Sequence, residues 1–292
     1  MNFTRRKFTQ SGLLASVAAL LGSSGMPTFA AEPLTAQQIV DKLIVAMGPA
    51  WHPTSYRDTF KMGDPDTPVK GVACCFMSTF DVIKRAHAKG LNFVISHEPT
   101  MWTDPDLLAP VQNDPLFKLK LEFVNDNKMV IWRTHDSLHS MQPEPMITAE
   151  NRALRWTAYA VPGHPMTYNF APHMSLKEVV GQFVENAPTR SARVIGDPEM
   201  TVATLAFCGH NLNPNVEGLE KYDATLSIEV REWETTEYGR DLVASGAKKA
   251  MIIVSHESGE ENMMHDFPHF FSKVVPEVPI EFVITEDRMW TL

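Results

Sequence analysis

The tripeptide Ser-His-Glu occurs twice in this chain, and each copy closes an apolar run, at residues 93–98 and 252–257. A stretch of helical character precedes each run and ends on small and basic residues, at 86–90 and 244–249. A short apolar strand that follows a helix so closely is typical of a parallel sheet with helices on its faces. Ligand-binding groups of such proteins gather at the carboxyl ends of the strands. The repeat therefore predicts an α/β fold with an imidazole beside a carboxylate at two strand ends.

The hydrophobic pattern predicts two related α/β lobes, at about residues 35–140 and 192–290, in a region that covers 31–292. The Pro- and His-bearing segment 140–174 is expected to be irregular apart from a short helix near 149–156. Apolar residues at helical spacing predict helices at 35–48, 78–89, 116–125, 175–184, 234–245 and 260–271. Apolar runs bounded by turn residues predict strands at 69–77, 91–95, 129–134, 192–195, 202–208, 223–230, 250–254 and 280–284.

The first thirty residues have the order of a twin-arginine signal peptide. Arg5 and Arg6 are followed by a mildly apolar stretch at 12–21 and by the small residues Thr28 and Ala30. The stretch is too short for an ordinary membrane-spanning helix. We therefore predict a signal peptide at 1–30 with cleavage after Ala30, and a periplasmic or other extracytoplasmic location. The alternative is an amphipathic terminal helix.

The charge balance excludes some classes of partner. The formal net charge is −9, and removal of the basic signal segment would make it more negative. An acidic chain without a basic stripe argues against nucleic acid and against anionic membrane surfaces. Outside the signal segment, the sequence has no apolar run of membrane-spanning length. The expected partner of the mature chain is therefore a small molecule.

The chain has three cysteines, which do not form a Cys-x-x-Cys pair. A structural zinc site or a redox pair is therefore not indicated. Cys74 and Cys75 lie in one apolar run, and Cys208 ends another. Buried, small apolar side chains are the simplest interpretation. A bridge from Cys208 to Cys74 or Cys75 after export is the alternative.

Metal-ligating side chains follow three predicted strands. Imidazole and carboxylate without thiolate form a ligand set for catalytic or borderline-hard divalent metals. A spacing of four residues, if helical, places two such groups on one helix face. Three clusters of this kind in one chain predict a metal site. The members are His97 and Glu98, then His135 and His139 at a spacing of four, then His256 with Glu257, with Glu260 four residues after His256, and with Glu261.

Other catalytic signatures are absent or weak in the sequence, such as a Ser-x-x-Lys pattern at 245–248, where a predicted helix ends. It has no Gly-x-x-x-x-Gly-Lys phosphate loop, no Gly-x-Gly-x-x-Gly fingerprint and no Gly-x-Ser-x-Gly elbow. Trp102 and Trp132 lie beside the expected ligands and either wall a substrate pocket or belong to the core. His210 follows the strand that ends at Cys208 and is a candidate to orient a ligand.

The strand-end segments resemble the motifs of a known family, the Nif-three-like dinuclear-metal-centre proteins, over about residues 35–290. Its first motif is a strand that ends in His-His, and here His97 matches while Glu98 replaces the second His. Its second motif is His-x-x-x-Asp, and here His135 matches while His139 takes the place of the Asp. The resemblance implies a metal site built on these segments.

Two further motifs carry the resemblance. The family's Gly-His-x-x-x-Glu motif keeps both ligands here, as His256 and Glu260, with Ser255 in place of Gly. Its Asp-Ala-x-x-x-Gly-Glu strand corresponds to residues 223–229, which lack the Gly and keep Glu229. The resemblance thus covers nearly all of the mature chain.

The resemblance implies a Nif-three-like fold of two lobes with a metal cleft between them. It further implies two divalent ions (Zn, Fe, Mn or Ni) and a ring-shaped homo-oligomer, often a hexamer. The expected roles are a bridging carboxylate at Glu260, terminal ligands at His97, Glu98, His139 and His256, a ligand or an orienting group at His135, and a general base at Glu257 or Glu229.

The resulting functional hypothesis is a metal-dependent hydrolase with a dinuclear centre that acts on a small molecule. Some relatives carry a cyclohydrolase label, which fits an exported chain poorly because nucleoside triphosphates are scarce outside the cytoplasm. The alternatives are a non-enzymatic periplasmic metal-binding or storage protein, and a scaffold whose metals only hold the lobes together. Metal ions with open coordination positions would favour the enzyme, and ions whose positions are all filled by protein ligands would favour the scaffold. Easy loss of the metal would favour the storage protein.

Overall fold

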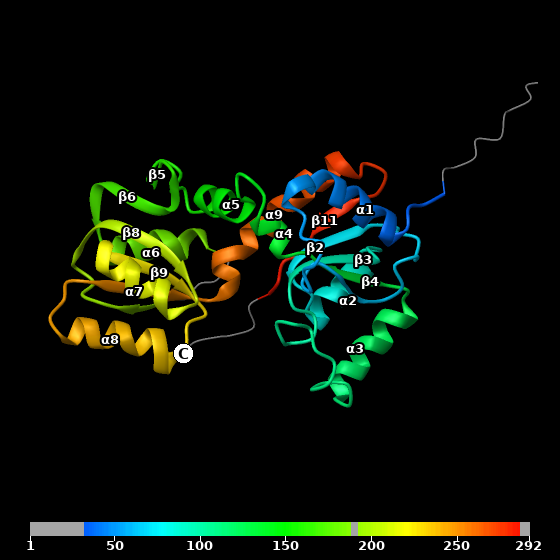
Figure 1. The fold of residues 1–292 in the computed structure, drawn as a ribbon, viewed down its shortest axis with the longest axis horizontal. Coiled ribbons are helices and arrows are strands. Elements are labelled where there is room, and N and C mark those ends of the chain that lie inside the picture. The colour runs from blue at the N-terminus through cyan, green and yellow to red at the C-terminus, as the bar shows by residue number, and fades with distance from the viewer. Residues whose placement is uncertain (1–31, 188–191, 287–292) are drawn as a thin grey trace, which may run out of the picture. The chain divides into compact units, whose positions relative to one another are not determined.

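The computed structural model describes residues 32–187 and 192–286. The expected signal peptide at 1–30 lies outside these ranges. The described residues form two mixed sheets, and helices cover both faces of each sheet (Figure 1). The predicted α/β class is therefore confirmed.

The first sheet has the strand order β1-β4-β3-β2-β11. β2, β3, β4 and β11 run parallel, and β1 pairs antiparallel with β4 at one edge. Neighbouring strands β2, β3 and β4 are also consecutive in sequence, as expected for βαβ units. The bounds are Phe60–Met62 for β1, Val72–Met77 for β2, Phe93–Glu98 for β3, Val130–Arg133 for β4 and Ile280–Phe282 for β11.

Helices pack on both faces of the first sheet. Helices α2 (Phe80–Ala88) and α3 (Pro115–Asp126) cover one face together with strand residues such as Cys75. Helices α1 (Ala36–Met47) and α9 (His256–Val274) cover the other face. This alternation follows from the two-residue repeat of a strand, which sends successive side chains to opposite faces.

The second sheet has the order β5-β6-β8-β9-β10-β7. Its centre, β8-β9-β10, is parallel, and β7 and β6 join it antiparallel. Helix α6 lies on one face, and α7 and α8 lie on the other. The bounds are Ala160–Val161 for β5, His164–Ser175 for β6, Leu176–Asn186 for α6, Arg193–Ile195 for β7, Thr201–Gly209 for β8, Leu212–Lys221 for α7, Ala224–Ile228 for β9, Glu237–Ala244 for α8 and Ala250–Val254 for β10.

Some elements differ from the sequence-based expectation. The short helix expected near 149–156 is α5 (Pro145–Ala153), which begins earlier, and the rest of the segment 140–174, expected to be irregular, contains the long strand β6. Pro172 conceals that strand in the sequence, and it lies where the pairing register with β8 shifts. A single π-helical turn, Glu232–Thr236, precedes α8, and a 3-10 turn, Gly48–Ala50, follows α1.

The two sheets also divide the chain differently from the expected lobes. β11 follows the long helix α9 and pairs with β2, so the segment near residue 280 belongs to the first sheet. β5 and β6 belong to the second sheet, although they precede residue 192. The second sheet is therefore inserted between α5 and α9 of a first lobe that the chain leaves and re-enters.

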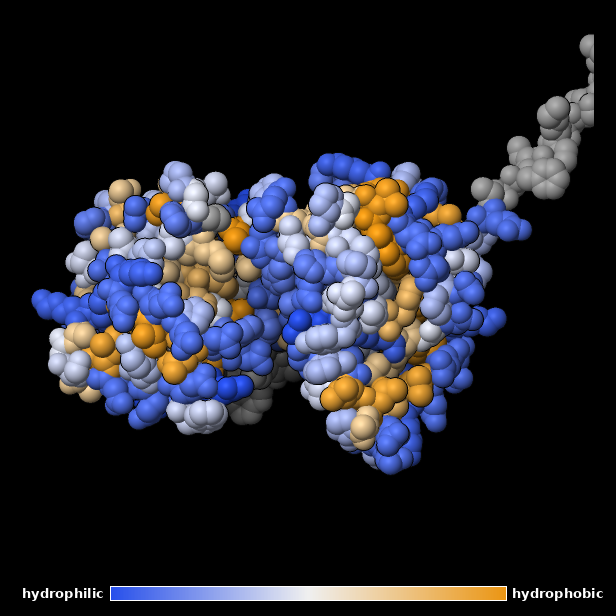
Figure 2. Space-filling view, viewed as in Figure 1, coloured by the Kyte–Doolittle hydropathy of each residue, from blue (hydrophilic) through white to orange (hydrophobic). Residues whose placement is uncertain are grey.

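The remaining surface and core features bear on the cysteine and membrane expectations. Cys74, Cys75 and Cys208 are free thiols, and the first two are completely buried. Trp132 is also buried, so it belongs to the core. None of the helices within residues 32–187 and 192–286 has the length and apolar character to cross a membrane. Apolar side chains gather over α3 and the loop before it on the face in Figure 2, where the half-exposed residues include Leu107, Leu108, Leu116 and Leu119.

Candidate metal centre

The first Ser-His-Glu lies in the last three residues of β3, which extends beyond its predicted end. The Ser96 hydroxyl donates to the Glu98 carbonyl at 2.8 Å and accepts the Ser78 N–H at 3.1 Å. These bonds tie the strand end to its neighbour. His97 and Glu98 are thereby held as buried side chains at the carboxyl end of a central strand.

The second Ser-His-Glu starts a helix instead. Ser255 is the N-cap of α9, and its hydroxyl accepts the Ser258 N–H. The helix therefore begins at His256 rather than near residue 260. As the spacing of four predicts, His256 and Glu260 lie on one face, with Nε2 of the ring 3.1 Å from Oε2 of the carboxylate.

The third segment is the short helix α4 (Asp136–His139), with His135 at its N-cap position. Its first turn is held by Asp58, whose carboxylate accepts the His135 N–H and, at 2.9 Å, the Ser137 N–H. A buried carboxylate at a helix N-terminus meets both the unpaired amides and the positive end of the helix dipole. Asp58 thus fixes the direction of both histidines of α4.

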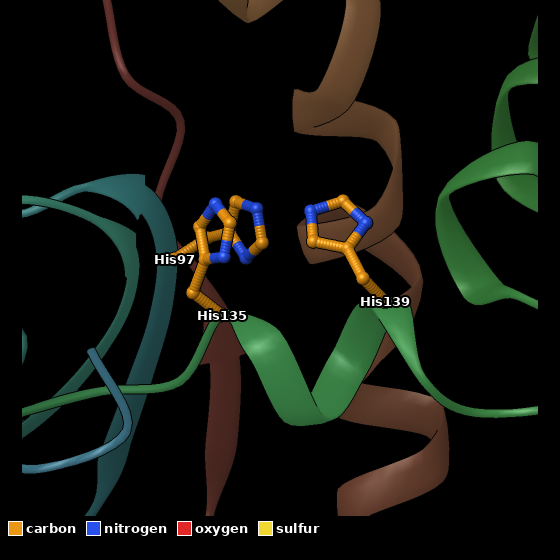
Figure 3. A group of neighbouring side chains, drawn as sticks. All are labelled: His97, His135 and His139. Carbon is orange, nitrogen blue, oxygen red and sulfur yellow. The ribbon is translucent and has the colours of Figure 1, made fainter. Parts of the chain in front are cut away.

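Three of the imidazoles form a compact group (Figure 3). The rings of His97 and His135 are stacked with centroids 4.5 Å apart, and His139 faces them from the other end of α4. The His139 ring centroid lies 5.1 Å from that of His97 and 4.8 Å from that of His135. One ligand atom from each ring falls within 4.8 Å of the others. This separation suits a shared metal ion.

Each histidine of the site is anchored in the same way, by an oxygen acceptor at Nδ1. Metal-ligating histidines almost always give their other N–H to a carboxylate or backbone carbonyl, which fixes the ring and its tautomer. With Nδ1 as the donor, Nε2 of each ring is left for a ligand. The pairs are His97 with the Thr134 carbonyl at 3.1 Å, His135 with Asp136 at 2.9 Å, His139 with Glu144 at 2.6 Å and His256 with Glu229 at 2.7 Å.

The Nε2 atoms meet two buried carboxylates. Glu98 Oε1 lies 4.0 Å from His97 Nε2, 3.5 Å from His135 Nε2 and 3.6 Å from His256 Nε2. Glu260 Oε2 lies 3.5 Å from His97 Nε2. The His97 Nε2 atom is buried without a hydrogen-bond partner. A metal ion would satisfy this orphaned nitrogen, so the donor set fits the implied metals.

The charges of the site are balanced by Arg133, which is fully buried at the end of β4. Its Nη2 donates to Glu98 Oε2 at 3.3 Å, and its Nε donates to the His97 carbonyl at 3.0 Å. Burial alone would raise the pKa of Glu98. The His135 hydrogen bond and the neighbouring rings outweigh burial and lower that pKa to about 2, so Glu98 is an anionic donor.

The rings at the two ends of the site differ in protonation. Burial lowers the pKa of His97, which is therefore neutral as a ligand must be. Burial also opposes the charge on His256, but the carboxylates of Glu229 and Glu260 raise its pKa to about 10. A metal ion that binds His256 through Nε2 would have to displace a proton there.

Two cavities open from this cluster. One, of about 990 Å³, is lined by Glu98, His135, His256 and Glu229 and by residues of the 99–104 loop. The other, of about 530 Å³, is lined by His139, Glu144, Glu260 and residues 206–222. The lining of each cavity combines residues of the first lobe, such as His135 and His256, with residues in or just after the strands β8 and β9 of the second sheet. Small molecules therefore have room to approach the cluster from either cavity.

The six predicted metal ligands lie together, whereas the two residues proposed as general base, Glu229 and Glu257, lie in different surroundings. Glu229, in the left-handed region at φ 48°, contacts Nδ1 of His256 and forms a candidate group with His256 and His210. Glu257 is absent from the candidate metal groups of the described residues; burial raises the pKa of its helical neighbour Glu261 to about 7, and the charge of Glu257 adds to this rise. The six candidate ligands that the structure gathers are His97, Glu98, His135, His139, His256 and Glu260.

The sequence did not reveal the residues that hold the ligands in place. The role of Arg133 was the easiest of these to predict from the sequence, since an Arg at the end of an otherwise apolar strand needs a buried partner. Asp136 is adjacent to His135 but had no signal of its own. Asp58 and Glu144 lie in Pro-rich loop segments, where acidic residues are common and carry no particular meaning.

Sequence comparison identifies the family. The profile of the family described as Duf34/NIF3 (NGG1p interacting factor 3) matches residues 59–288. A curated relative, the GTP cyclohydrolase 1 type 2 homolog of Clostridium acetobutylicum, is 21% identical over 159 residues. The match covers 50% of this chain and 56% of the relative, so the chain spans little more than half the length of this relative.

Solved structures share the fold at low sequence identity. A Staphylococcus aureus protein is 14% identical with a TM-score of 0.67, and the match covers 89% of this chain and all of that one. A Bacillus cereus protein related to NIF3 is 13% identical with a TM-score of 0.65, and the match covers 89% of this chain and 99% of that one. Reduced HcgD from Methanocaldococcus jannaschii is 17% identical with a TM-score of 0.62, and the match covers 87% of this chain and 98% of that one. With its family profile matched over most of its length, and with candidate His and Glu groups consistent with a dinuclear centre, this chain belongs to the Duf34/NIF3 family.

Proposed function

We propose that this protein is a dinuclear metallohydrolase that acts on a small molecule. The observation that carries the proposal is the convergence of four anchored imidazoles and two buried carboxylates on one cluster that borders large cavities. Purely structural metal sites are closed by protein ligands, whereas catalytic sites keep a position open to substrate. The cavities favour the second kind of site.

The six gathered residues would hold two divalent ions, with Glu98 and Glu260 between the imidazoles. When bound, such ions supply Lewis-acid activation of the substrate and a water nucleophile at neutral pH. Glu98 is the more central carboxylate, since its Oε1 has three imidazole nitrogens within 4.0 Å. Glu260 has two imidazole nitrogens, of His97 and His256, within 3.5 Å. Either geometry suits a carboxylate shared by two ions.

The proposed general base is Glu229. Its carboxylate lines the 990 Å³ cavity, while Glu257 is not among the described residues that do so. One oxygen of Glu229 holds the Nδ1 proton of His256, and its side chain is 66% exposed, which leaves the carboxylate accessible from the cavity. Glu229 would then both orient His256 and accept a proton from the attacking water.

A metal-stabilised scaffold is the second candidate, and one observation favours it. The ligands come from β3, α4 and α9, three elements far apart in sequence, so bound ions would cross-link them. A scaffold predicts a large loss of thermal stability on metal removal and no exchangeable water on the ions. An enzyme predicts exchangeable water, which proton relaxation of the Mn²⁺-loaded protein would detect.

The test is a comparison of metal content and turnover in matched variants. We expect about two ions per chain in the wild type by mass spectrometry of metals, as in other two-metal sites. Glu260→Gln should weaken both ions, whereas His139→Gln should weaken mainly one. Glu217→Gln, an exposed change in the smaller cavity, is the control for folding and should keep both.

Activity would be sought on a panel of small esters, lactones, amides and phosphoesters. Turnover that falls with the metal content of Glu260→Gln supports the hydrolase. The proposal fails if the wild type binds at most one ion under saturating conditions, or if Glu260→Gln keeps full turnover.

A further inference from the structure

The loop that follows β3 holds Trp102 in an unusual conformation. Its backbone lies in the left-handed region at φ 60°, which is unfavourable for a residue with a large side chain. The indole is nevertheless 51% exposed, so burial of the ring does not compensate for this backbone. Conformations of this kind cluster at functional sites, where the surrounding structure holds them.

Buried charged residues fix the backbone just before Trp102. The Asp106 carboxylate accepts the Thr100 N–H at 2.7 Å and the Met101 N–H at 2.9 Å. The Lys120 ammonium, on α3, donates to the Thr100 carbonyl at 2.6 Å. Both side chains are almost completely buried, and Asp106 is also paired with Lys61 at 3.1 Å. A loop held by buried charges presents Trp102 rigidly.

The indole has one supported face and one open side. The Lys120 ammonium lies over the ring, 5.3 Å from its centroid, as in a cation–π contact. Trp102 also lines the 990 Å³ cavity whose wall includes Glu98, His135 and His256. Trp102 and these three candidate metal ligands therefore line one cavity, and a molecule that fills it would contact both.

We infer that Trp102 is a stacking platform that selects substrates with a planar, unsaturated ring attached to the group that reacts at the metal centre. This inference rests on the dinuclear centre proposed above. A rigid half-exposed indole offers a large apolar face at little cost in side-chain entropy, and ring pairs prefer offset-stacked or edge-to-face contact. A small aliphatic substrate would leave this face in water.

The test uses three hydroxamic acids that carry the same metal-binding group: benzohydroxamate, cyclohexanecarbohydroxamate and acetohydroxamate. Their affinities for the metal-loaded protein are measured by calorimetry, so that no substrate is needed. We expect benzohydroxamate to bind about threefold to tenfold more tightly than the cyclohexyl compound, the range of a favourable aromatic pair. Trp102→Ala should remove this preference, and Trp102→Phe should keep most of it.

A matched control is Trp233→Ala, which removes an indole that is 75% exposed and does not line this cavity. It should leave the preference unchanged. Tight binding of acetohydroxamate with no benefit from the phenyl ring, or an equal benefit in Trp102→Ala, would overturn the platform while the metal centre stands. If none of the three compounds binds to protein that holds its metal, the open centre is wrong and the platform falls with it.

Discussion

At the scale of residues, the important contacts of the candidate site are those between Nδ1 of each histidine and an oxygen acceptor. Each imidazole contacts a different acceptor through Nδ1: a carbonyl, an aspartate or one of two glutamates. These contacts favour the tautomer that points Nε2 at the candidate metal site, and they increase the basicity of the ring. An imidazole without its acceptor could rotate or carry its proton on the wrong nitrogen.

We therefore predict that Glu144→Gln lowers metal affinity by about tenfold to a hundredfold. Glu144 is not itself a member of the two candidate metal groups that contain His97. The amide can turn its NH₂ toward Nδ1 of His139 and oppose the required tautomer. Competition with a coloured chelator would measure the affinity. Glu217→Gln should be neutral, and an unchanged affinity in Glu144→Gln would show that the anchor at Nδ1 of His139 is unimportant.

At the scale of residues, the sequence predicted the candidate ligands but not the residues that hold them in place. His97, His135 and His256 were predictable because strand ends collect functional groups. The contact of Asp58 with the His135 amide was not, because it spans 77 residues and depends on how a loop closes over α4. Side-chain contacts of such long range leave no local pattern.

At the scale of elements, one tripeptide adopts two structures. Ser96 lies in a strand and binds backbone groups at its end, whereas Ser255 caps the nineteen-residue helix α9. The tripeptide is the same in both, so the difference comes from the residues on its C-terminal side. Pro99 ends the first copy, and a helical pattern continues the second.

The cap at Ser255 gives a quantitative prediction. Ser255→Ala should lower the free energy of unfolding by about 1 kcal/mol, since it removes the acceptor for the first turn of α9. Ser255→Gly should cost only a few tenths of a kcal/mol, because glycine is tolerated at this position. Urea denaturation of the two variants measures both values. Equal losses would mean that the cap does not stabilise α9.

Most elements were predictable from periodicity, and the exceptions have identifiable causes. Helix α1 begins after Thr35 as predicted and has the full capping box. Helix α7 was not predicted, because Pro214 and Gly218 occur within ten residues. Gly218 is required there by packing: a Cβ would lie 2.7 Å from the Cys208 sulfur. Propensity scales penalise such a glycine, whereas the tertiary contact demands it.

For the whole molecule, we predict export by the twin-arginine route. The motivating residues are Arg5, Arg6 and the exit at Ala30. Replacement of both arginines by Lys should leave the precursor in the cell, as shown by fractionation and immunoblotting. The same protein with the natural pair is the control. Equal export of the two would contradict the route.

We also predict a homo-oligomer, of the ring type that the resemblance implies. The half-exposed leucines of α3 and the preceding loop offer apolar surface that subunit contacts would cover. Light scattering after size exclusion should give a mass that is several times the 32.7 kDa of one chain. A monomer at micromolar concentration with metal bound would refute the ring.

The return of the chain to its first sheet sets the order of events during synthesis. A ribosome delivers the candidate ligands of β3 and of the α4 segment long before α9, which carries His256 and Glu260, and before β11, which completes the sheet. A nascent chain thus exposes an incomplete set of candidate ligands and could not yet enclose the proposed pair of ions. If the protein is exported folded by the predicted twin-arginine route, the proposed ions would be loaded between translation of α9 and translocation, and they would be those of the cytoplasm.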